Sequence, residues 1–288
     1  MPPLISTAEL AARLAKPAAG RPPLRIFDGT VQLRPARPGP YTAESGRADY
    51  EAAHIPGAAF VDLLAELSHP HPTLRFTLPA PEVLADALGP AGLSDGDECV
   101  VYSSTSPMWA TRLWWMLHAL GVPSSVLDGG LPKWQAEGWP VARGVERYPP
   151  GRLHPRFDAS RWAGQAEVLR ATADGGVCLL NALTASLHDG RADVDYGRKG
   201  HIRGSVNLPY PALLQEDGCF RPLDELRAAF AAVGALDRPR AICYCGGGIA
   251  ATMSAMSLHR LGHPDVAVYD GSLAEWAADP TLPMDTGR

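Results

Sequence analysis

A cysteine followed by three glycines is the pattern in this chain that most directly indicates chemistry. Cys245 ends a short apolar run, and Gly246, Gly247 and Gly248 separate it from the small, helix-forming residues that begin at Ile249. Glycine allows the backbone to turn tightly, so that successive N–H groups can converge on one point. We predict that these amides and the N-terminus of the following helix surround the Cys245 sulfur, which favours its nucleophilic thiolate form.

The overall composition is that of an ordinary globular protein and argues against several classes of partner. The chain has 288 residues, a hydrophobic fraction of 46% and a net charge of −5. This length allows one large or two medium domains, each with its own core. The negative net charge gives no basis for nucleic-acid binding, and no apolar run approaches the ~20 residues that span a membrane. We therefore expect neither nucleic acid nor membrane among the partners.

The cysteines are five in number and scattered, with neither Cys-x-x-Cys nor zinc-ligand spacing: Cys99, Cys178, Cys219, Cys243 and Cys245. This pattern predicts no disulfide framework and no metal site, and it favours the reducing cytoplasm as the location. The first 23 residues show no basic stretch followed by an apolar core, so no secretory signal is expected.

The chain repeats itself at an offset of 141 to 147 residues. Residues 54–58 (HIPGA) return as 201–205 (HIRGS), and residues 127–134 (LDGGLPKW) return as 269–276 (YDGSLAEW). Several such phrases in one order at a nearly constant offset indicate a tandem duplication.

Each half alternates short apolar runs with helical stretches, which is typical of a parallel sheet covered by helices. In the first half, an apolar stripe at helical spacing runs from Ala110 to Leu120. The sequence therefore predicts two tandem α/β domains at 1–145 and 161–288, joined by a Pro-rich linker at 146–160. The predicted strands are Leu24–Phe27, Cys99–Tyr102, Ser125–Leu127, Val177–Leu180, Ala241–Tyr244 and Val266–Tyr269.

The two halves differ at the position of the cysteine. Alignment of Tyr102 with Tyr244 places Ser103 opposite Cys245. The first-half loop, taken as 103–109, has no glycine run, and its proline and bulky residues would not suit a ring of amides. This asymmetry predicts one catalytic and one supporting domain.

These motifs together resemble the tandem-domain rhodanese family of sulfurtransferases, over roughly residues 5 to 280. The resemblance implies two rhodanese-like domains, the first non-catalytic and the second catalytic, without metal or organic cofactor. Cys245 would take sulfur from a small anionic donor, thiosulfate or 3-mercaptopyruvate, as a persulfide, and pass it to cyanide or to a thiol, including a protein thiol. The amides of the loop would bind the substrate. The loop residues concerned are Gly246, Gly247, Gly248, Ile249 and Ala250, and the phrases that carry the resemblance are 54–58, 114–115, 127–134, 200–209 and 269–276.

The chain departs from the family pattern where the donor should bind. Its loop begins Cys-Gly-Gly-Gly, closer to the Cys-Gly-Ser/Thr-Gly of mercaptopyruvate-type members than to the Cys-Arg-Lys-Gly of thiosulfate-type members. Leu183 and Leu187 stand where the family has two donor-holding arginines, and leucine cannot replace a guanidinium. Arg198 and Arg203 are candidate replacements, with Arg191 and Lys199 close by. The alternative is that these cations are solvated surface charges.

Other polar residues occur in both halves and are therefore interpreted as structural. His54 and His201 occupy equivalent turns, and we expect their rings to stabilise those turns. Asp128 and Asp270 each end a strand, and we expect each to cap the turn that follows. Cys243 lies within a strand and is expected to be an inert apolar side chain.

Two other functions compete with small-molecule sulfur transfer. Cysteine-based phosphatases need an arginine six residues after the cysteine, where this chain has Ala251, so a phosphatase is disfavoured. A persulfide carrier or redox sensor fed by a partner protein stays open, because such a protein does not need the missing arginines.

Overall fold

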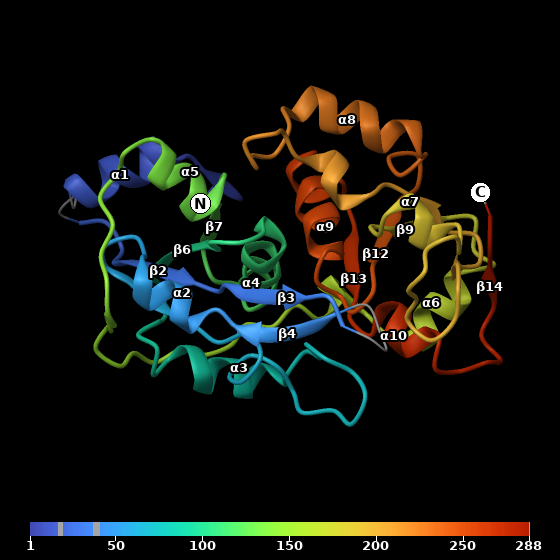
Figure 1. Cartoon of the computed structure of the whole chain (residues 1–288), viewed down its shortest axis with the longest axis horizontal. Helices are drawn as coiled ribbons and strands as arrows, with labels where there is room; N and C mark the ends of the chain where they lie inside the picture. Colours follow the sequence, from blue (N-terminus) through green and yellow to red (C-terminus); the bar gives the residue numbers. More distant parts are fainter. Residues whose placement is uncertain (17–19, 37–40, 288) are drawn as a thin grey trace.

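A computed structural model describes residues 1–16, 20–36 and 41–287, and it folds them into two α/β domains of the same design (Figure 1). Each domain has a five-stranded sheet in which every neighbouring pair is parallel. The first sheet has the order β1 (Leu4–Ile5), β7 (Ser124–Leu127), β6 (Glu98–Tyr102), β2 (Leu24–Asp28), β5 (Ala58–Phe60). The second has the order β11 (Val206–Asn207), β9 (Val177–Asn181), β12 (Arg240–Tyr244), β13 (Val266–Tyr269), β8 (Trp162–Ala163).

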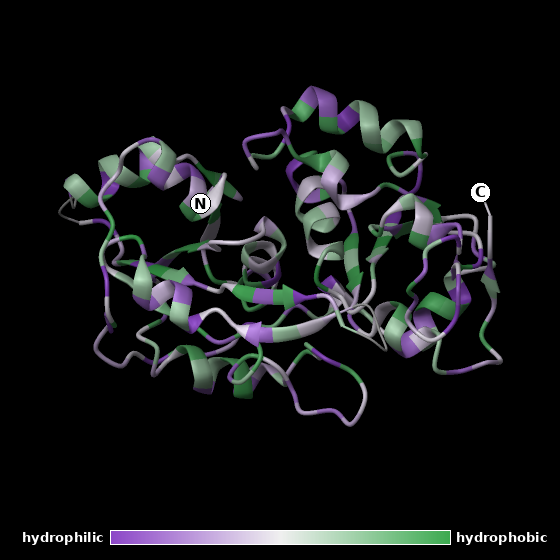
Figure 2. Cartoon of the chain, viewed as in Figure 1, coloured by the Kyte–Doolittle hydropathy of each residue, from purple (hydrophilic) through white to green (hydrophobic). Residues whose placement is uncertain are grey.

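All six predicted strands are confirmed, each within one residue at either end. They are continuous apolar runs because helices cover both faces of each sheet, and the central strands are coloured as hydrophobic in Figure 2. The duplication extends to topology, since β6 and β12 occupy the central position of their sheets.

The remaining elements lie around these two sheets. Two antiparallel pairs add to them: β3 (Val31–Arg34) with β4 (Thr42–Ser45), and β10 (His201–Ile202) with β14 (Met284–Asp285). The helices of the first half are α1 (Thr7–Ala15), α2 (Arg47–Ala52), α3 (Pro81–Leu88), α4 (Pro107–Ala119) and α5 (Gly130–Ala136). Those of the second half are α6 (Gln165–Ala171), α7 (Ala185–His188), α8 (Leu223–Ala232), α9 (Ala251–Arg260) and α10 (Ser272–Trp276), with 3-10 turns at Ala159–Arg161 and Tyr210–Leu213.

Helices α4 and α9 pack against each other between the two sheets and join the domains (Figure 1). Because α4 is covered by its own sheet and by α9, it is buried on nearly every side, beyond the predicted stripe. The hydroxyls of Thr111 and Thr252 lie 2.7 Å apart across this contact. One expectation needs correction: α4 begins at Pro107, so the first-half loop is only 103–106, and the proline starts a helix where its missing N–H costs nothing.

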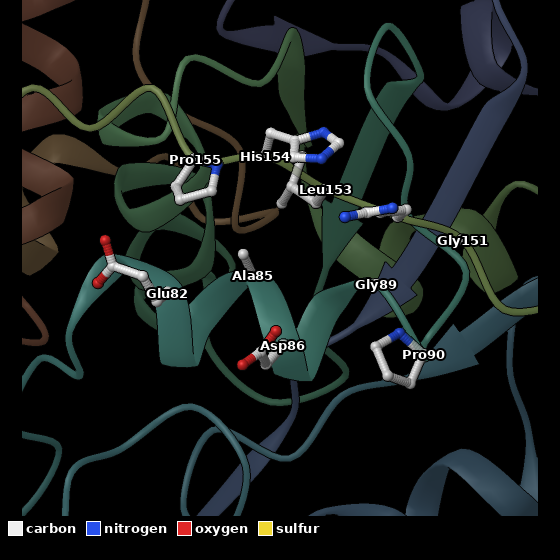
Figure 3. A pocket seen from close by; sticks show the side chains of 10 residues that line it. Glu82, Ala85, Asp86, Gly89, Pro90, Gly151, Leu153, His154 and Pro155 are labelled. Carbon is white, nitrogen blue, oxygen red and sulfur yellow. The ribbon is translucent and has the colours of Figure 1, made fainter.

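The predicted linker is extended and packs along the first domain. Tyr148 donates a hydrogen bond to the Gly57 carbonyl and accepts one from the Ile26 amide. Further along, the Gly151 amide donates to the carbonyl of Gly89 at 2.8 Å. Figure 3 shows the hollow between α3 and this segment, lined by Glu82, Ala85, Asp86, Gly89, Pro90, Gly151, Arg152, Leu153, His154 and Pro155.

Two aspartates tie the domains together in a reciprocal way. Asp128 accepts a hydrogen bond from the Phe220 amide at 2.9 Å, and Asp270 accepts one from the Leu78 amide at 2.7 Å. Leu78 and Phe220 are separated by the same 142 residues as the two aspartates. The expectation that these aspartates cap turns of their own domain was therefore wrong, since each carboxylate reaches the other domain.

The two equivalent histidines behave as expected. The ring of His54 bonds to the carbonyl of Tyr50 at 2.8 Å, and the ring of His201 bonds to that of His188 at 2.8 Å. Both rings are buried, and each holds a backbone carbonyl near the C-terminal end of a short helix, α2 or α7.

Candidate active site

Cys245 follows the last residue of the central strand β12, and residues 245–250 lead from there into α9. The side chain of Cys245 is buried, with 3% of its surface exposed. The carboxyl edge of a parallel sheet is where α/β proteins commonly place a functional loop. The strand and the helix predicted on either side of the cysteine are both present.

The N–H groups of the loop divide into two sets. Those of Cys245 and Gly248 donate to Ser272 Oγ at 3.1 and 3.0 Å, and this hydroxyl donates to the carbonyl of Tyr269 at 2.8 Å. Among the described residues, no partner takes the amides of Gly246, Gly247, Ile249 and Ala250. Fewer amides are therefore free to surround the Cys245 sulfur than predicted, because the Gly248 amide already donates to Ser272.

The direction of two free amides is determined through their neighbouring carbonyls. Leu273 and Ala274, in the first turn of α10, donate to the carbonyls of Cys245 and Gly246 at 3.1 and 2.9 Å. A peptide group is planar, and its C=O and N–H point in opposite directions. Holding these two carbonyls toward α10 turns the amides of Gly246 and Gly247 away from it.

Two of the three glycines cannot be replaced without a clash. A Cβ on Gly246 would lie 2.0 Å from Cζ of Tyr196. Gly248 has φ of +74°, and a Cβ there would lie 2.5 Å from the carbonyl oxygen of Asp270. Gly247 is different, because its nearest neighbour would be the hydroxyl of Tyr41 at 3.8 Å, an ordinary contact distance.

Ser272 was missed in the sequence analysis, although the repeat contains the signal. It has φ of +49°, a left-handed conformation that costs a non-glycine residue energy. The equivalent first-half residue is Gly130, with φ of +57°. The second half therefore places a strained serine where glycine would fit, and that serine holds the cysteine loop.

The first domain also contributes residues to the loop, and these too were missed. Arg112 of α4 donates to the carbonyl of Gly248 at 3.2 Å and pairs with Asp270 at 2.7 Å. Arg75 donates to the carbonyl of Tyr41 at 3.3 Å, and the Tyr41 hydroxyl and the backbone carbonyl of Arg75 lie near Gly247. The site is thus built where the domains meet.

Two tyrosines cover the loop with neutral phenols. Burial, followed by the negative charge available at Cys245, raises the pKa of Tyr41 to about 12. The pKa of Tyr196 is raised as well, first by burial. No residue of the described ranges bonds to either hydroxyl. Both phenols are therefore potential hydrogen-bond donors to a sulfur species at Cys245.

This combination of folds and loop can be compared with known proteins. The model of the rhodanese-like domain matches residues 9–137 and 174–279. The chain belongs to the rhodanese family. It is 33% identical to 3-mercaptopyruvate sulfurtransferase of Escherichia coli over 90% of this chain and 94% of that protein. It is also 33% identical to thiosulfate sulfurtransferase of Cricetulus griseus, over 99% and 96% of the two chains.

A solved structure agrees with these matches. The crystal structure of SseA from Escherichia coli, a 3-mercaptopyruvate sulfotransferase, superposes with a TM-score of 0.82 at 30% identity, covering 94% of this chain and 99% of that one. The predicted fold, two tandem rhodanese domains with parallel sheets, is confirmed.

The cations predicted to replace the family arginines of this rhodanese lie in other contacts. Arg198 donates to four backbone carbonyls of the C-terminal segment, those of Trp276, Ala277, Asp279 and Leu282. Arg203 is exposed and pairs with Asp285 at 3.1 Å. None of these contacts involves the cysteine loop. Among the described contacts, it is the side chain of Arg112 that reaches the loop, at the carbonyl of Gly248.

The other four thiols of this rhodanese are buried. Burial raises the pKa of Cys178 to about 11 and that of Cys219 to about 12. It also raises the pKa of Cys99 and, as expected for a strand residue, that of Cys243. Within the described ranges, no group of three metal-ligating side chains occurs, and no helix is long and apolar enough to cross a bilayer.

Proposed function

We propose that this rhodanese is a sulfurtransferase that carries sulfur as a persulfide on Cys245. The observation that carries the proposal is that Cys245 lies, buried, in the loop that leads into α9, and that the amides of Gly246, Gly247, Ile249 and Ala250 in this loop have no partner among the described residues. Such amides stabilise negative charge on sulfur without a metal or cofactor. The names of the relatives support thiosulfate and 3-mercaptopyruvate as donors.

The first half-reaction loads the cysteine. The Cys245 thiolate attacks the outer sulfur of thiosulfate, the S–S bond breaks, and sulfite leaves with the electron pair. With 3-mercaptopyruvate the C–S bond breaks instead, and the pyruvate enolate takes up the proton that the donor thiol releases. In both cases one sulfur atom is added to Cys245.

The second half-reaction returns the enzyme to its starting state. Cyanide or a thiolate attacks the outer persulfide sulfur, the S–S bond breaks, and the Cys245 thiolate is released. Both half-reactions keep the negative charge on sulfur, so the same amides serve throughout. In this scheme residues 161–288 are catalytic, residues 1–145 support the loop, and 146–160 connect them.

A second candidate is a persulfide carrier that receives sulfur from a partner protein. The observation that favours it is Leu183. This residue is buried two positions after β9, the strand that pairs with β12, and it stands where the family resemblance implies a donor-binding arginine. A protein thiol as donor or acceptor needs no such cation. Five unpaired cysteines suit a reducing compartment, and we propose the cytoplasm as the location.

The test is sulfur transfer to cyanide, measured as thiocyanate, with each small donor in turn. Wild type should gain one sulfur atom (~32 Da) on donor treatment and turn over, and Cys245→Ser should do neither. Cys219→Ser, which removes another buried thiol, should match wild type. Absence of both mass gain and turnover would exclude small donors. If Cys245 then gained sulfur only from a persulfide-bearing protein, the second candidate, the persulfide carrier, would be supported.

A further inference from the structure

We propose that Arg112, from the non-catalytic domain, is a positioning residue that orients the Ile249 amide for sulfur binding. The proposal rests on the function proposed above, because it assigns a role in the same loop. Its basis is a set of contacts that crosses from α4 to the cysteine loop.

Arg112 is completely buried, and its contacts include the cysteine loop and residues of both domains. One terminal nitrogen donates to the carbonyl of Gly248 at 3.2 Å and pairs with Asp270 at 2.7 Å. The other donates to the carbonyl of Phe76. The guanidinium carbon lies 4.8 Å from the ring centre of Trp162. A planar guanidinium with several donors can hold these partners together, whereas an ammonium group cannot.

The contact with Gly248 has a direct consequence for the next amide. The Gly248 carbonyl and the Ile249 N–H belong to one planar peptide group and point in opposite directions. Arg112 holds that carbonyl on the first-domain side, so the Ile249 N–H points away from Arg112. Ser272 meanwhile holds the Gly248 N–H from its own domain at 3.0 Å. Gly248 is thus fixed at both ends, by one residue from each domain.

The repeat shows that this arginine is not simply part of the domain contact. Both halves have the reciprocal aspartate tie, through Asp128 and Asp270. The residue equivalent to Arg112 in the second half is Ser254, which offers no guanidinium. The aspartate tie is therefore common to both halves. An arginine also lies near the Asp128 tie, since the guanidinium carbon of Arg260 is 5.8 Å from the ring centre of Phe220, but the arginine whose described contacts include the cysteine loop is Arg112.

The experiment compares Arg112→Lys and Asp270→Asn with the matched variant Asp128→Asn in the full chain. Asp128→Asn weakens the equivalent domain tie but touches nothing in the loop. We measure the single-turnover rate of persulfide formation by intact mass, kcat and KM for the donor, alkylation of Cys245 by iodoacetamide, and the thermal midpoint.

We expect Arg112→Lys and Asp270→Asn to lower the persulfide rate and kcat by about 10- to 100-fold, with KM changed less than threefold. The rate at which iodoacetamide alkylates Cys245 should also differ from the wild-type rate in both variants. Asp128→Asn should keep the wild-type rates, even where its thermal midpoint falls as far. If Arg112→Lys does not fold, the comparison of Asp270→Asn with Asp128→Asn tests the proposal by itself.

Two results would overturn the proposal. One is wild-type persulfide and alkylation rates in a folded Arg112→Lys or Asp270→Asn variant. The other is an equal loss in Asp128→Asn, which would assign the effect to domain docking. Failure of the proposed function looks different, because wild type itself would then form no persulfide. In that case the alkylation rates still test whether Arg112 shapes the loop.

Discussion

Ser272 illustrates how a single residue can be chosen against its own backbone preference. Its left-handed conformation suits glycine, and the first half has glycine there. Strain of this kind costs about 1 kcal/mol, and each hydrogen bond from a loop amide returns about as much. The serine is therefore best explained by the two loop amides that it binds.

Replacement of Ser272 should separate stability from activity. Ser272→Ala keeps the strain and loses the hydroxyl, so we expect a loss of roughly 2 kcal/mol in unfolding free energy. Ser272→Gly loses the same bonds but relieves the strain, and should be about 1 kcal/mol more stable than the alanine variant. Both should lose sulfur-transfer activity to a similar extent. Denaturant unfolding and the thiocyanate assay check this, and equal activity in wild type and Ser272→Gly would contradict it.

The glycines of the loop should differ sharply in their tolerance of alanine. Gly246→Ala would push its methyl into Tyr196, so we expect activity to fall by at least about tenfold as the loop shifts. Gly247→Ala meets only ordinary contacts and should keep most of the activity. Thiocyanate rates of the two variants provide the comparison. Similar losses in both would show that the amides need glycine for another reason.

At the scale of elements, the sequence predicted what repeats and what is apolar. The six long strands, the helix after Cys245 and the two-domain plan followed from apolar runs and from duplicated phrases. The site residues that were missed lie on elements brought to the loop by tertiary packing: Tyr41, Arg75, Arg112 and Ser272. The positions of Tyr41, Arg75 and Arg112 relative to the loop depend on how the two domains pack, for example α4 against α9, which no local pattern expresses. Ser272 lies in the same domain as the loop, and comparison of the two halves could have found it. Sequence alone also could not show that Arg198 is used by the C-terminal segment.

The N-terminal turn of α10 acts on the loop in the same indirect way as Arg112. Its amides hold the carbonyls of Cys245 and Gly246. Because each peptide group is planar, this contact also fixes the direction of the Gly246 and Gly247 amides. Three of the four free amides are thus oriented by groups on the far side of the loop. In the proposed function, most of the groups that bind sulfur are therefore backbone amides, and a run of three glycines can contribute to a specific site without side chains.

At the scale of the whole molecule, the contact between domains contains histidines. His118 of α4 stacks on Trp114, with ring centres 4.8 Å apart, and its ring centre lies 4.6 Å from that of His259 on α9. Burial, and then the neighbouring His259, lowers the pKa of His118 from 6.5 to about 4. His118 therefore binds a proton less readily in the folded protein than in the unfolded chain.

This packing should make His118 a source of acid sensitivity. Between pH 6.5 and about 4 the unfolded state binds the proton and the folded state does not, so unfolding free energy falls with pH by at most about 1.4 kcal/mol per unit from this group. His118→Gln should remove that share and flatten the curve in this window only. Urea unfolding of both proteins from pH 4 to 8 measures it. Parallel curves throughout would refute the assignment.

The reciprocal aspartate contacts bear on how the duplicated chain arose. Asp128 and Leu78 both belong to the first half, as Asp270 and the partner amide Phe220 both belong to the second. Each half therefore carries both members of the tie, so two copies of one half could close on each other through a two-fold axis with every bond satisfied. The present chain has the geometry of such a symmetric dimer joined into one polypeptide. Once joined, the copies were free to diverge, so that one carries the proposed nucleophile, Cys245, and the other carries the arginine that contacts its loop.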